Sequence, residues 1–464
     1  MTFLIRHSLK VSLLMVLLLF LACLHYIFSI DLFTLGGDQM RWVELIERLY
    51  RGQFYWSDLW DPHGSHRAPA YKAIFLANAK FFGLNMQLEQ VLGAMAWTGA
   101  AVVATIGVAR HFGRPATMAT AFVLISTPFI VMNGQVFQTV LSYSVISLRM
   151  LDMMCFFIVF ILLSRNLNRK PNYLDSLKLV ALMALFSLFI GRGWGQAMLA
   201  TVFLVVVVYA VLNLHDLTKE RIGKTLFPPA AGALLFVCVY RIGIESEVSA
   251  LSELMDFQSL MTFVLTLMGR TLTFQHISVE NGENLLPILV VGGFIAAIYA
   301  LAICLFFVKR QYRQGWFPFC LMMFSLGAIL CVYLGRGVSL GGGWQGALFP
   351  RHLPECSVGF AGALVCIACA VKQSRHGVVV AILCVLLVAS QSIAVIKTAT
   401  HSSYRAKYAE RRAEAFFGPV SAFSDKAVVK SARCHSEELC VYVRGIVDQY
   451  GLMKQGRDKV NQDD

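Results

Sequence analysis

Apolar runs long enough to cross a bilayer recur along most of this sequence, and they restrict its fold more than any other feature. A transmembrane helix needs about 20 mostly apolar residues, because each residue adds about 1.5 Å along the helix axis. Runs of this kind lie at 11–32, 88–109, 115–133, 143–164, 176–191, 197–214, 225–243, 286–308, 317–335, 353–371 and 377–396. The pattern predicts an all-α integral membrane protein with about eleven transmembrane helices.

The composition agrees with this class of protein. Of the 464 residues, 57% are hydrophobic and 14% are charged, whereas soluble domains carry roughly 45–50% apolar and about 25% charged residues. The formal net charge of +13 would suggest a nucleic-acid partner in a soluble chain. Here most basic residues fall in short loops on one side of the predicted membrane, so no nucleic-acid partner is needed.

Alternate loops are basic, as the positive-inside rule requires of cytoplasmic loops. Their basic residues are Arg110, Arg114, Arg165, Arg169, Lys170, Lys178, Lys219, Arg221, Lys224, Lys309, Arg310, Arg313, Lys372 and Arg375. The N-terminus, with Arg6 and Lys10, belongs to the same side. An odd number of crossings then puts the C-terminus on the extracytoplasmic side.

Three longer segments are expected outside the membrane. They are a first loop at 33–87, a second loop at 244–284 and a small C-terminal domain at 398–464, all joined to a transmembrane domain at 1–397. The C-terminal domain holds Cys434 and Cys440, which lie close together in a polar segment. This spacing predicts a disulfide, since the compartment outside is oxidising.

Amphipathic patterns predict two helices that lie in the membrane interface within the first loop. Trp42, Ile46 and Leu49 recur at helical spacing, and charged residues fill the other face. A second helix is expected at 71–82, entered through a proline and closed by a glycine. In the second loop, the short apolar segment 259–274 is expected to lie on the interface or dip into it.

Asp38 directly follows the first predicted span. A carboxylate at the boundary between hydrocarbon and water can accept a proton from a hydroxyl group held beside it, as a general base must. The alternative is that Asp38 caps a helix that begins near Met40 and favours its dipole. The two roles are compatible.

The first loop also holds the sequence HGSHR, with Asp61 just upstream. His63 and His66 could bind a metal together with a carboxylate, but the sequence places no third strong ligand, so we predict no metal site. Arg67 is better suited to bind two oxygens of a phosphate group. The remaining alternative is a loop fixed by ordinary hydrogen bonds.

Several arginines fall at the extracytoplasmic ends of predicted helices, against the orientation rule. They are Arg192, Arg270, Arg336 and Arg351. Singly, each could extend to lipid headgroups. Together they predict a cationic site of phosphate size on the outer face, with glycines beside Arg192 and Arg336 allowing close backbone approach.

One charged pair lies within a predicted span. Arg149 and Asp152 are three residues apart on a helix and are expected to neutralise each other. The alternative is a proton or ion pathway, which is less favoured because we find no second acidic residue buried in another span to continue a relay.

The arrangement of one basic-inside helix, a long outer loop that opens with an acid, and a series of further spans resembles the C-type fold superfamily of membrane glycosyltransferases. It is most similar to bacterial members whose first loop carries a Trp-rich stretch ending in an H-N-E-H-R motif. In this chain, Gly64 and Ser65 replace the Asn and Glu of that motif. The other matching positions are Trp56, Trp60, His63, His66 and Arg67, followed late in the chain by Gly335-Arg336 and Arg351-His352.

The resemblance implies a transferase in a bacterial inner membrane that takes a sugar from a polyprenyl-phosphate donor and passes it to a cell-envelope glycan or lipid on the periplasmic face. Asp38 would deprotonate the acceptor, and the five arginines would stabilise the leaving phosphate. The residues expected to contact substrate are Trp56, Trp60, Asp61, His63, His66, Trp194, Trp344 and His352. No organic cofactor is expected, and a divalent cation could assist the leaving phosphate.

Two other functions are compatible with the sequence. An O-antigen polymerase or ligase also joins lipid-linked glycans outside, although its large outer loops tend to come late in the chain, whereas the longest loop here comes first. A transporter or flippase of lipid-linked saccharides would usually show repeated halves, and we find no convincing internal repeat.

Overall fold

In the computed structural model of this chain, the residues described are 2–30, 35, 37–61, 68–113, 117–136, 140–141, 148–170, 172–190, 194–241, 257–273, 285–334, 343–348, 352–371, 376–400, 402–425, 428 and 436–453. Within these ranges every regular element is a helix and no strand occurs. The predicted all-α class is therefore confirmed for this part of the chain.

Seven helices are long and apolar enough to cross a membrane. They are α1 (Thr2–Ile30), α4 (Met86–Phe112), α8 (Met150–Asn168), α10 (Trp194–Leu212), α15 (Leu285–Val308), α17 (Leu353–Ala370) and α18 (Gly377–Thr400). By length and composition, the chain is a multi-pass membrane protein.

Each of the other four predicted spans also coincides with a helix, but a shorter or interrupted one. Two are apolar helices, α5 (Met118–Val131) and α16 (Phe317–Val332). In the other two, a π-helical turn joins an α-helix: α9 (Tyr173–Leu185) runs into η3 (Phe186–Ile190), and η5 (Ile222–Leu226) runs into α12 (Phe227–Arg241).

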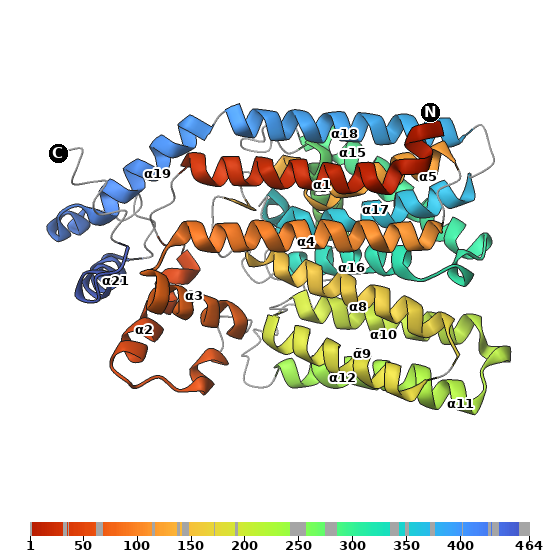
Figure 1. Cartoon of the computed structure of the whole chain (residues 1–464), viewed down its shortest axis with the longest axis horizontal. Coiled ribbons are helices and arrows are strands. Elements are labelled where there is room, and N and C mark those ends of the chain that lie inside the picture. Colours follow the sequence, from red (N-terminus) through yellow and green to blue (C-terminus); the bar gives the residue numbers. More distant parts are fainter. Residues whose placement is uncertain are drawn as a thin grey trace.

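The long helices lie side by side along one direction, as Figure 1 shows. The N-terminus and the short helix α11 (Lys219–Arg221) lie at one end of this bundle, and the first-loop and C-terminal helices lie at the other. The interior is apolar, with Phe156 and Phe160 of α8 packed on Phe324 of α16 at 5.6 and 5.7 Å between ring centroids.

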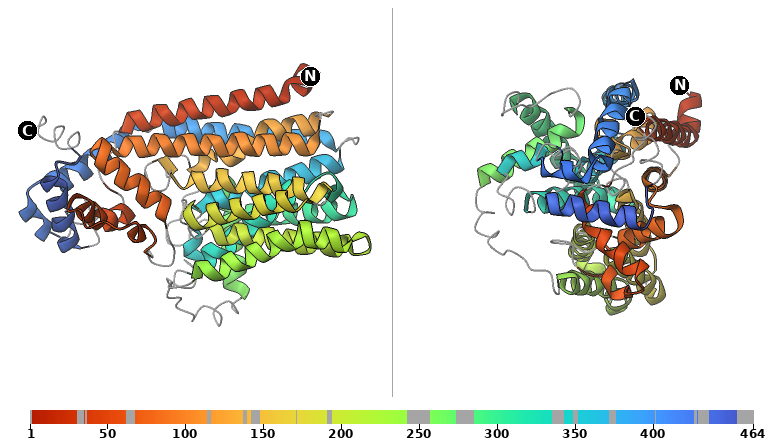
Figure 2. Two further views of the ribbon diagram at one scale, coloured as in Figure 1. Left: turned by 60° about the horizontal axis from the view of Figure 1, so that its bottom comes forward. Right: turned by 90° about the vertical axis from the view of Figure 1, so that its left-hand side faces the viewer.

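A second hydrophobic core lies at the first-loop end of the bundle. It is formed by α2 (Gly37–Tyr50), α3 (Pro69–Phe82), α19 (Ser402–Phe417) and α21 (Glu437–Gln449). The left view in Figure 2 shows these helices gathered beyond the ends of the long ones. We call this unit the outer domain.

Aromatic contacts and hydrogen bonds join the two ends of the sequence within the outer domain. Tyr50 of α2 stacks on Tyr450 with ring centroids 4.5 Å apart. The hydroxyl of Tyr442 donates to Glu47 at 2.5 Å, and the backbone N–H of Met453 donates to the carbonyl of Gly83 at 2.8 Å. The C-terminal segment therefore completes the first-loop fold.

This arrangement differs from the expected membrane-parallel helices. The apolar face of α2, with Trp42 and Ile46, is buried against protein, and Trp42 meets Phe75 of α3 edge to face at 5.8 Å. The amphipathic pattern identifies the apolar face correctly, but the same pattern suits a protein core as well as a lipid surface. The pattern does not reveal which of the two covers it.

The second-loop helix α14 (Phe257–Thr273) also packs more closely than expected. A methyl group at Gly269 would overlap the carbonyl oxygen of Ile288, and one at Gly292 would overlap that of Leu265. The two glycines let α14 and α15 approach backbone to backbone, as small residues do in membrane helix pairs. The segment expected to lie on the interface or to dip into it is thus a helix that packs against α15.

Candidate functional site

Three long helices begin close together at the end of the bundle that carries the outer domain. Helix α8 begins after Arg149, α10 begins at Trp194, and α17 begins after His352. The N-terminal end of a helix carries unpaired N–H groups and a partial positive charge. Three such ends next to one another favour a negatively charged ligand.

A buried ion pair lies at this point. The Nε of Arg149 is 2.6 Å from Oε1 of Glu355, and its Nη2 donates to Oε2 at 3.1 Å. The two side chains are only 6% and 1% exposed. A charge so deeply buried requires a partner, since leaving one ion alone is strongly destabilising.

Aromatic rings enclose the pair. The guanidinium of Arg149 lies over the Trp194 ring, 5.7 Å from its centroid, and Trp194 meets the His352 ring at 5.8 Å. Trp194 and His352, both predicted to contact substrate, are thus brought together from helices far apart in sequence. Their neighbours in the chain are the predicted phosphate-binding residues Arg192 and Arg351.

Asp152 has a partner that the sequence did not predict. Its carboxylate accepts a hydrogen bond from the hydroxyl of Tyr71 on α3, and both residues are fully buried. The expectation that Arg149 and Asp152 neutralise each other included neither Glu355 nor Tyr71. Spacing along one helix says nothing about the residues of neighbouring helices. The Tyr71–Asp152 bond ties the outer domain to the bundle.

Glu355 is the functional candidate that the sequence reasoning missed. It lies in the first turn of α17, inside the predicted span 353–371. A signal existed, because an acid within a membrane span is a functional candidate by default. The structure therefore provides the further buried acid on another span that a proton or ion pathway would require.

Lys72 of α3 holds the segment that leads into HGSHR. Its buried ammonium group donates to the backbone carbonyls of Asp58 and Asp61 at 3.0 and 2.9 Å. Burial lowers the pKa of Lys72, although the negative charges of Asp61 and Asp58 oppose this shift. Lys72 is thus a positioning residue for the predicted loop.

The two tryptophans predicted from this loop have different surroundings. Trp56 is 78% exposed, so its ring is accessible to a ligand. Trp60 meets Phe189 edge to face at 4.7 Å and so contacts the π-helical turn that precedes α10. Trp60 therefore borders the cluster around Trp194, whereas Trp56 faces solvent.

Asp38 belongs to the first turn of α2, which begins at Gly37 and not near Met40. Its side chain lies outside the described part of the structure. The next residue, Gln39, is buried and donates to Oε2 of Glu89 at 2.6 Å, and Asn78 donates to Oε1 of the same carboxylate at 2.8 Å. These bonds anchor the segment around Asp38 to the start of α4.

Other predicted site residues lie outside the described residues. They are His63, His66, Arg67, Arg192, Arg336, Arg351 and Cys434, and also the side chain of Trp344 in η8 (Gly343–Leu348). Cys440 is buried and disulfide-bonded, and its pairing with Cys434 remains a prediction. Arg270 is buried in α14, which packs against η8 and α17.

In the ranges that the structure describes, no group of three or more His, Cys, Asp or Glu side chains is arranged to hold a metal ion. The cluster at the helix N-termini has a different composition. It combines one guanidinium group, two acids and two aromatic rings in a buried setting. Such a set can orient an anionic or sugar-bearing ligand and can exchange protons with it.

No protein-family model, curated protein or solved structure matches this chain. Function is therefore inferred from the residues of the chain itself.

Proposed function

We propose that this chain is a membrane glycosyltransferase that moves a sugar from a polyprenyl-phosphate donor to a glycan or lipid acceptor. The observation that supports this most is the cluster of Arg149, Glu355, Trp194 and His352 at the converging helix N-termini, beside the outer domain. This is a place where a lipid-borne phosphate and a sugar can be held at the edge of the membrane. A sugar ring fits against aromatic faces, and a phosphate fits against guanidinium groups and helix N-termini.

The proposed topology has eleven crossings, with the N-terminus in the cytoplasm of a bacterium and the outer domain in the periplasm. Every predicted span coincides with a helix, and the basic loops that follow α4 and α8 lie at the end opposite the outer domain. That distribution is what the positive-inside rule requires of an inner-membrane protein.

In the proposed reaction, Asp38 takes the proton from the acceptor hydroxyl as its oxygen forms a bond to the anomeric carbon of the sugar. The bond between that carbon and the phosphate oxygen breaks, and its electron pair leaves with the lipid phosphate. Arginines stabilise the charge that develops on this phosphate. They are Arg67, Arg192, Arg270, Arg336 and Arg351. Because a phosphate leaves without a proton, one carboxylate is sufficient.

The test replaces Asp38 with Asn. Asp175→Asn is the matched control, because Asp175 lies partly exposed in the first turn of α9, far from the outer domain. Each variant is expressed in the producing bacterium from which the gene has been deleted, and the envelope glycans are analysed by mass spectrometry. We expect Asp38→Asn to be inserted normally and to leave the glycan without its added sugar, while the control restores it. Full restoration by Asp38→Asn would refute the assignment of the base.

A transporter or flippase of lipid-linked saccharides is the second candidate, because two acids, Asp152 and Glu355, are buried in different membrane helices. Buried acids on neighbouring helices are typical of proton-coupled transport. Reconstituted vesicles separate the two functions. Movement of a lipid-linked saccharide between leaflets without any transfer to an acceptor would favour the transporter.

A further inference from the structure

A cavity lined in part by basic and polar side chains lies at the opposite end of the bundle, where α4 and α8 end and the chain enters α16. It encloses about 240 Å³, which is smaller than the roughly 300–1,000 Å³ of cavities that hold whole drug-sized ligands. The cavity is far from the outer domain and plays no part in the proposed transfer. Its size suits one small group and not a whole nucleotide sugar.

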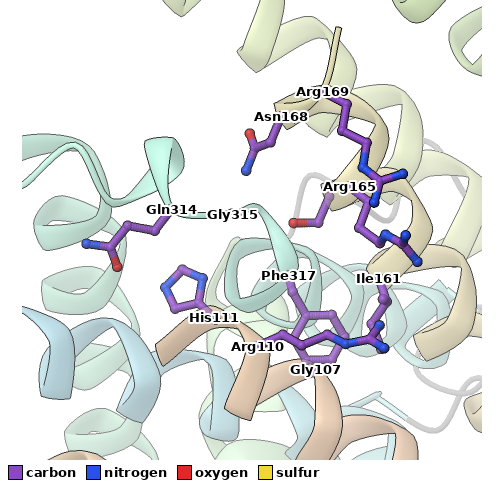
Figure 3. A pocket seen from close by; sticks show the side chains of 11 residues that line it. Gly107, Arg110, His111, Ile161, Arg165, Asn168, Arg169, Gln314, Gly315 and Phe317 are labelled. Carbon is purple, nitrogen blue, oxygen red and sulfur yellow. The ribbon is translucent and has the colours of Figure 1, made fainter. Parts of the chain in front are cut away.

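Three guanidinium groups line this cavity, from Arg110 of α4 and from Arg165 and Arg169 at the end of α8. Figure 3 shows the side chains that surround it. No acidic residue is among the lining residues, and within the described part of the chain none of these three arginines has a carboxylate at ion-pair distance. The orientation rule alone can explain basic residues here, so a second observation is needed.

His111 provides it. The residue is only 7% exposed and lines the cavity, and neither of its ring nitrogens has a hydrogen-bond partner among the described residues. A buried imidazole without partners loses the hydrogen bonds it would make to water. Native structures rarely leave such a group unpaired, and each case requires an explanation. A ligand in the cavity would supply the missing partner.

Gly315 keeps the cavity open beside this imidazole. A methyl group at Gly315 would lie 3.0 Å from Oγ of Ser164 and 3.3 Å from Nδ1 of His111. Ser164 Oγ already accepts the backbone N–H of Trp316 at 2.8 Å, which leaves its hydroxyl hydrogen to donate. Imidazole and hydroxyl therefore both border the space beside Gly315, in a lining to which the three arginines also belong.

We propose that this cavity binds a phosphate group, carried either by an anionic lipid headgroup in the adjoining leaflet or by a soluble phosphate. Guanidinium, imidazole and hydroxyl groups are the donors that phosphate oxygens accept, and the lining contains no acid to repel them. The proposal does not depend on the glycosyltransferase assignment.

The test uses the full-length protein with two probes. Native mass spectrometry measures retention of phosphatidylglycerol against phosphatidylcholine from nanodiscs, and a thermal-shift titration compares inorganic phosphate with chloride at equal ionic strength. The variant Arg165→Gln/Arg169→Gln removes two lining cations. Its control, Arg310→Gln/Arg313→Gln, removes the same charge at the same end from residues that do not line the cavity.

We expect Arg165→Gln/Arg169→Gln to weaken binding of one probe at least about 10-fold, since a charge-assisted hydrogen bond corresponds to about that factor or more. The control should bind like the wild type. Gly315→Ala keeps every charge but narrows the cavity, and it should also weaken binding while the protein stays folded. Loss of phosphatidylglycerol binding alone identifies a headgroup site, and loss of inorganic phosphate binding alone identifies a site for a soluble ligand. An equal loss of binding in Arg310→Gln/Arg313→Gln would overturn the proposal. So would a wild-type protein that prefers neither phosphatidylglycerol over phosphatidylcholine nor inorganic phosphate over chloride.

Discussion

Removing one partner of the Arg149–Glu355 pair tests whether this pair holds the candidate site together. The change is Glu355→Gln, which keeps the shape of the side chain and removes its charge. Both side chains are almost fully buried, and the guanidinium fork reaches both carboxylate oxygens at 2.6 and 3.1 Å. Breaking a buried pair from one side costs about 3–5 kcal/mol. Glutamine retains one acceptor, so we expect a loss of about 3 kcal/mol, or roughly 100-fold in the unfolding equilibrium.

The assay is equilibrium unfolding in mixed detergent micelles, followed by tryptophan fluorescence. Arg149→Met should lose a similar amount, and Arg149→Met/Glu355→Leu should lose less than either single variant because no buried charge is left unpaired. Glu220→Gln is the matched control, since its pair with Lys224 is exposed, and it should leave the midpoint unchanged. A double variant whose loss equals the sum of the two single losses would show that the two charges are not coupled.

Three further predictions concern the close helix pair, the outer domain and the loop before HGSHR. Gly292→Ala should destabilise the protein by about 1–3 kcal/mol, because its methyl group would overlap a carbonyl oxygen of α14. The methyl group of Gly293→Ala would meet no atom within 4 Å, so this variant should be neutral or slightly stabilising in the same unfolding assay. Phe416→Ala removes a fully buried ring from the outer-domain core and should lower the free energy of unfolding of this domain by about 3–5 kcal/mol. The measurement is the rate of proteolysis within α2, which should increase. Val420→Ala changes an exposed side chain and should leave this rate unchanged. Burial lowers the pKa of Lys72 in the folded protein below the ordinary value of 10.5. Between the folded-state pKa and 10.5, the folded state therefore binds fewer protons than the unfolded chain, and the free energy of unfolding should rise with pH. A rise of equal size in Lys72→Met would contradict this.

The long apolar helices could be predicted from the sequence because hydrocarbon thickness imposes a length that a run of apolar residues reveals directly. The amphipathic face of α2 was also evident from the positions of Trp42 and Ile46. Its partners were not, because lipid and protein select the same spacing, and one of the helices that cover it, α21, is distant in sequence. The pairing of Arg149 with Glu355 was hidden for the same reason, since no local pattern reports a contact across more than 200 residues of sequence.

The role of Asp38 stays a prediction, because the described structure does not include its side chain. The same holds for the predicted phosphate-binding residues Arg67, Arg192, Arg336 and Arg351. What could be read from sequence was the kind of residue at each boundary between lipid and water. What could not be read was the meeting of Trp194 with His352, which requires two helix starts to be adjacent in space.

The composition of the outer-domain core bears on how the protein is made. Helix α2 (Gly37–Tyr50) leaves the ribosome well before α21 (Glu437–Gln449), because the two lie far apart in the sequence. Until α21 is made, the nascent chain therefore carries an apolar surface on α2 that α3 covers only in part. A message truncated before the codon for Glu437 would yield a polypeptide that keeps the long apolar helices but leaves part of this surface permanently uncovered, a form that proteases and chaperones can distinguish from the complete fold.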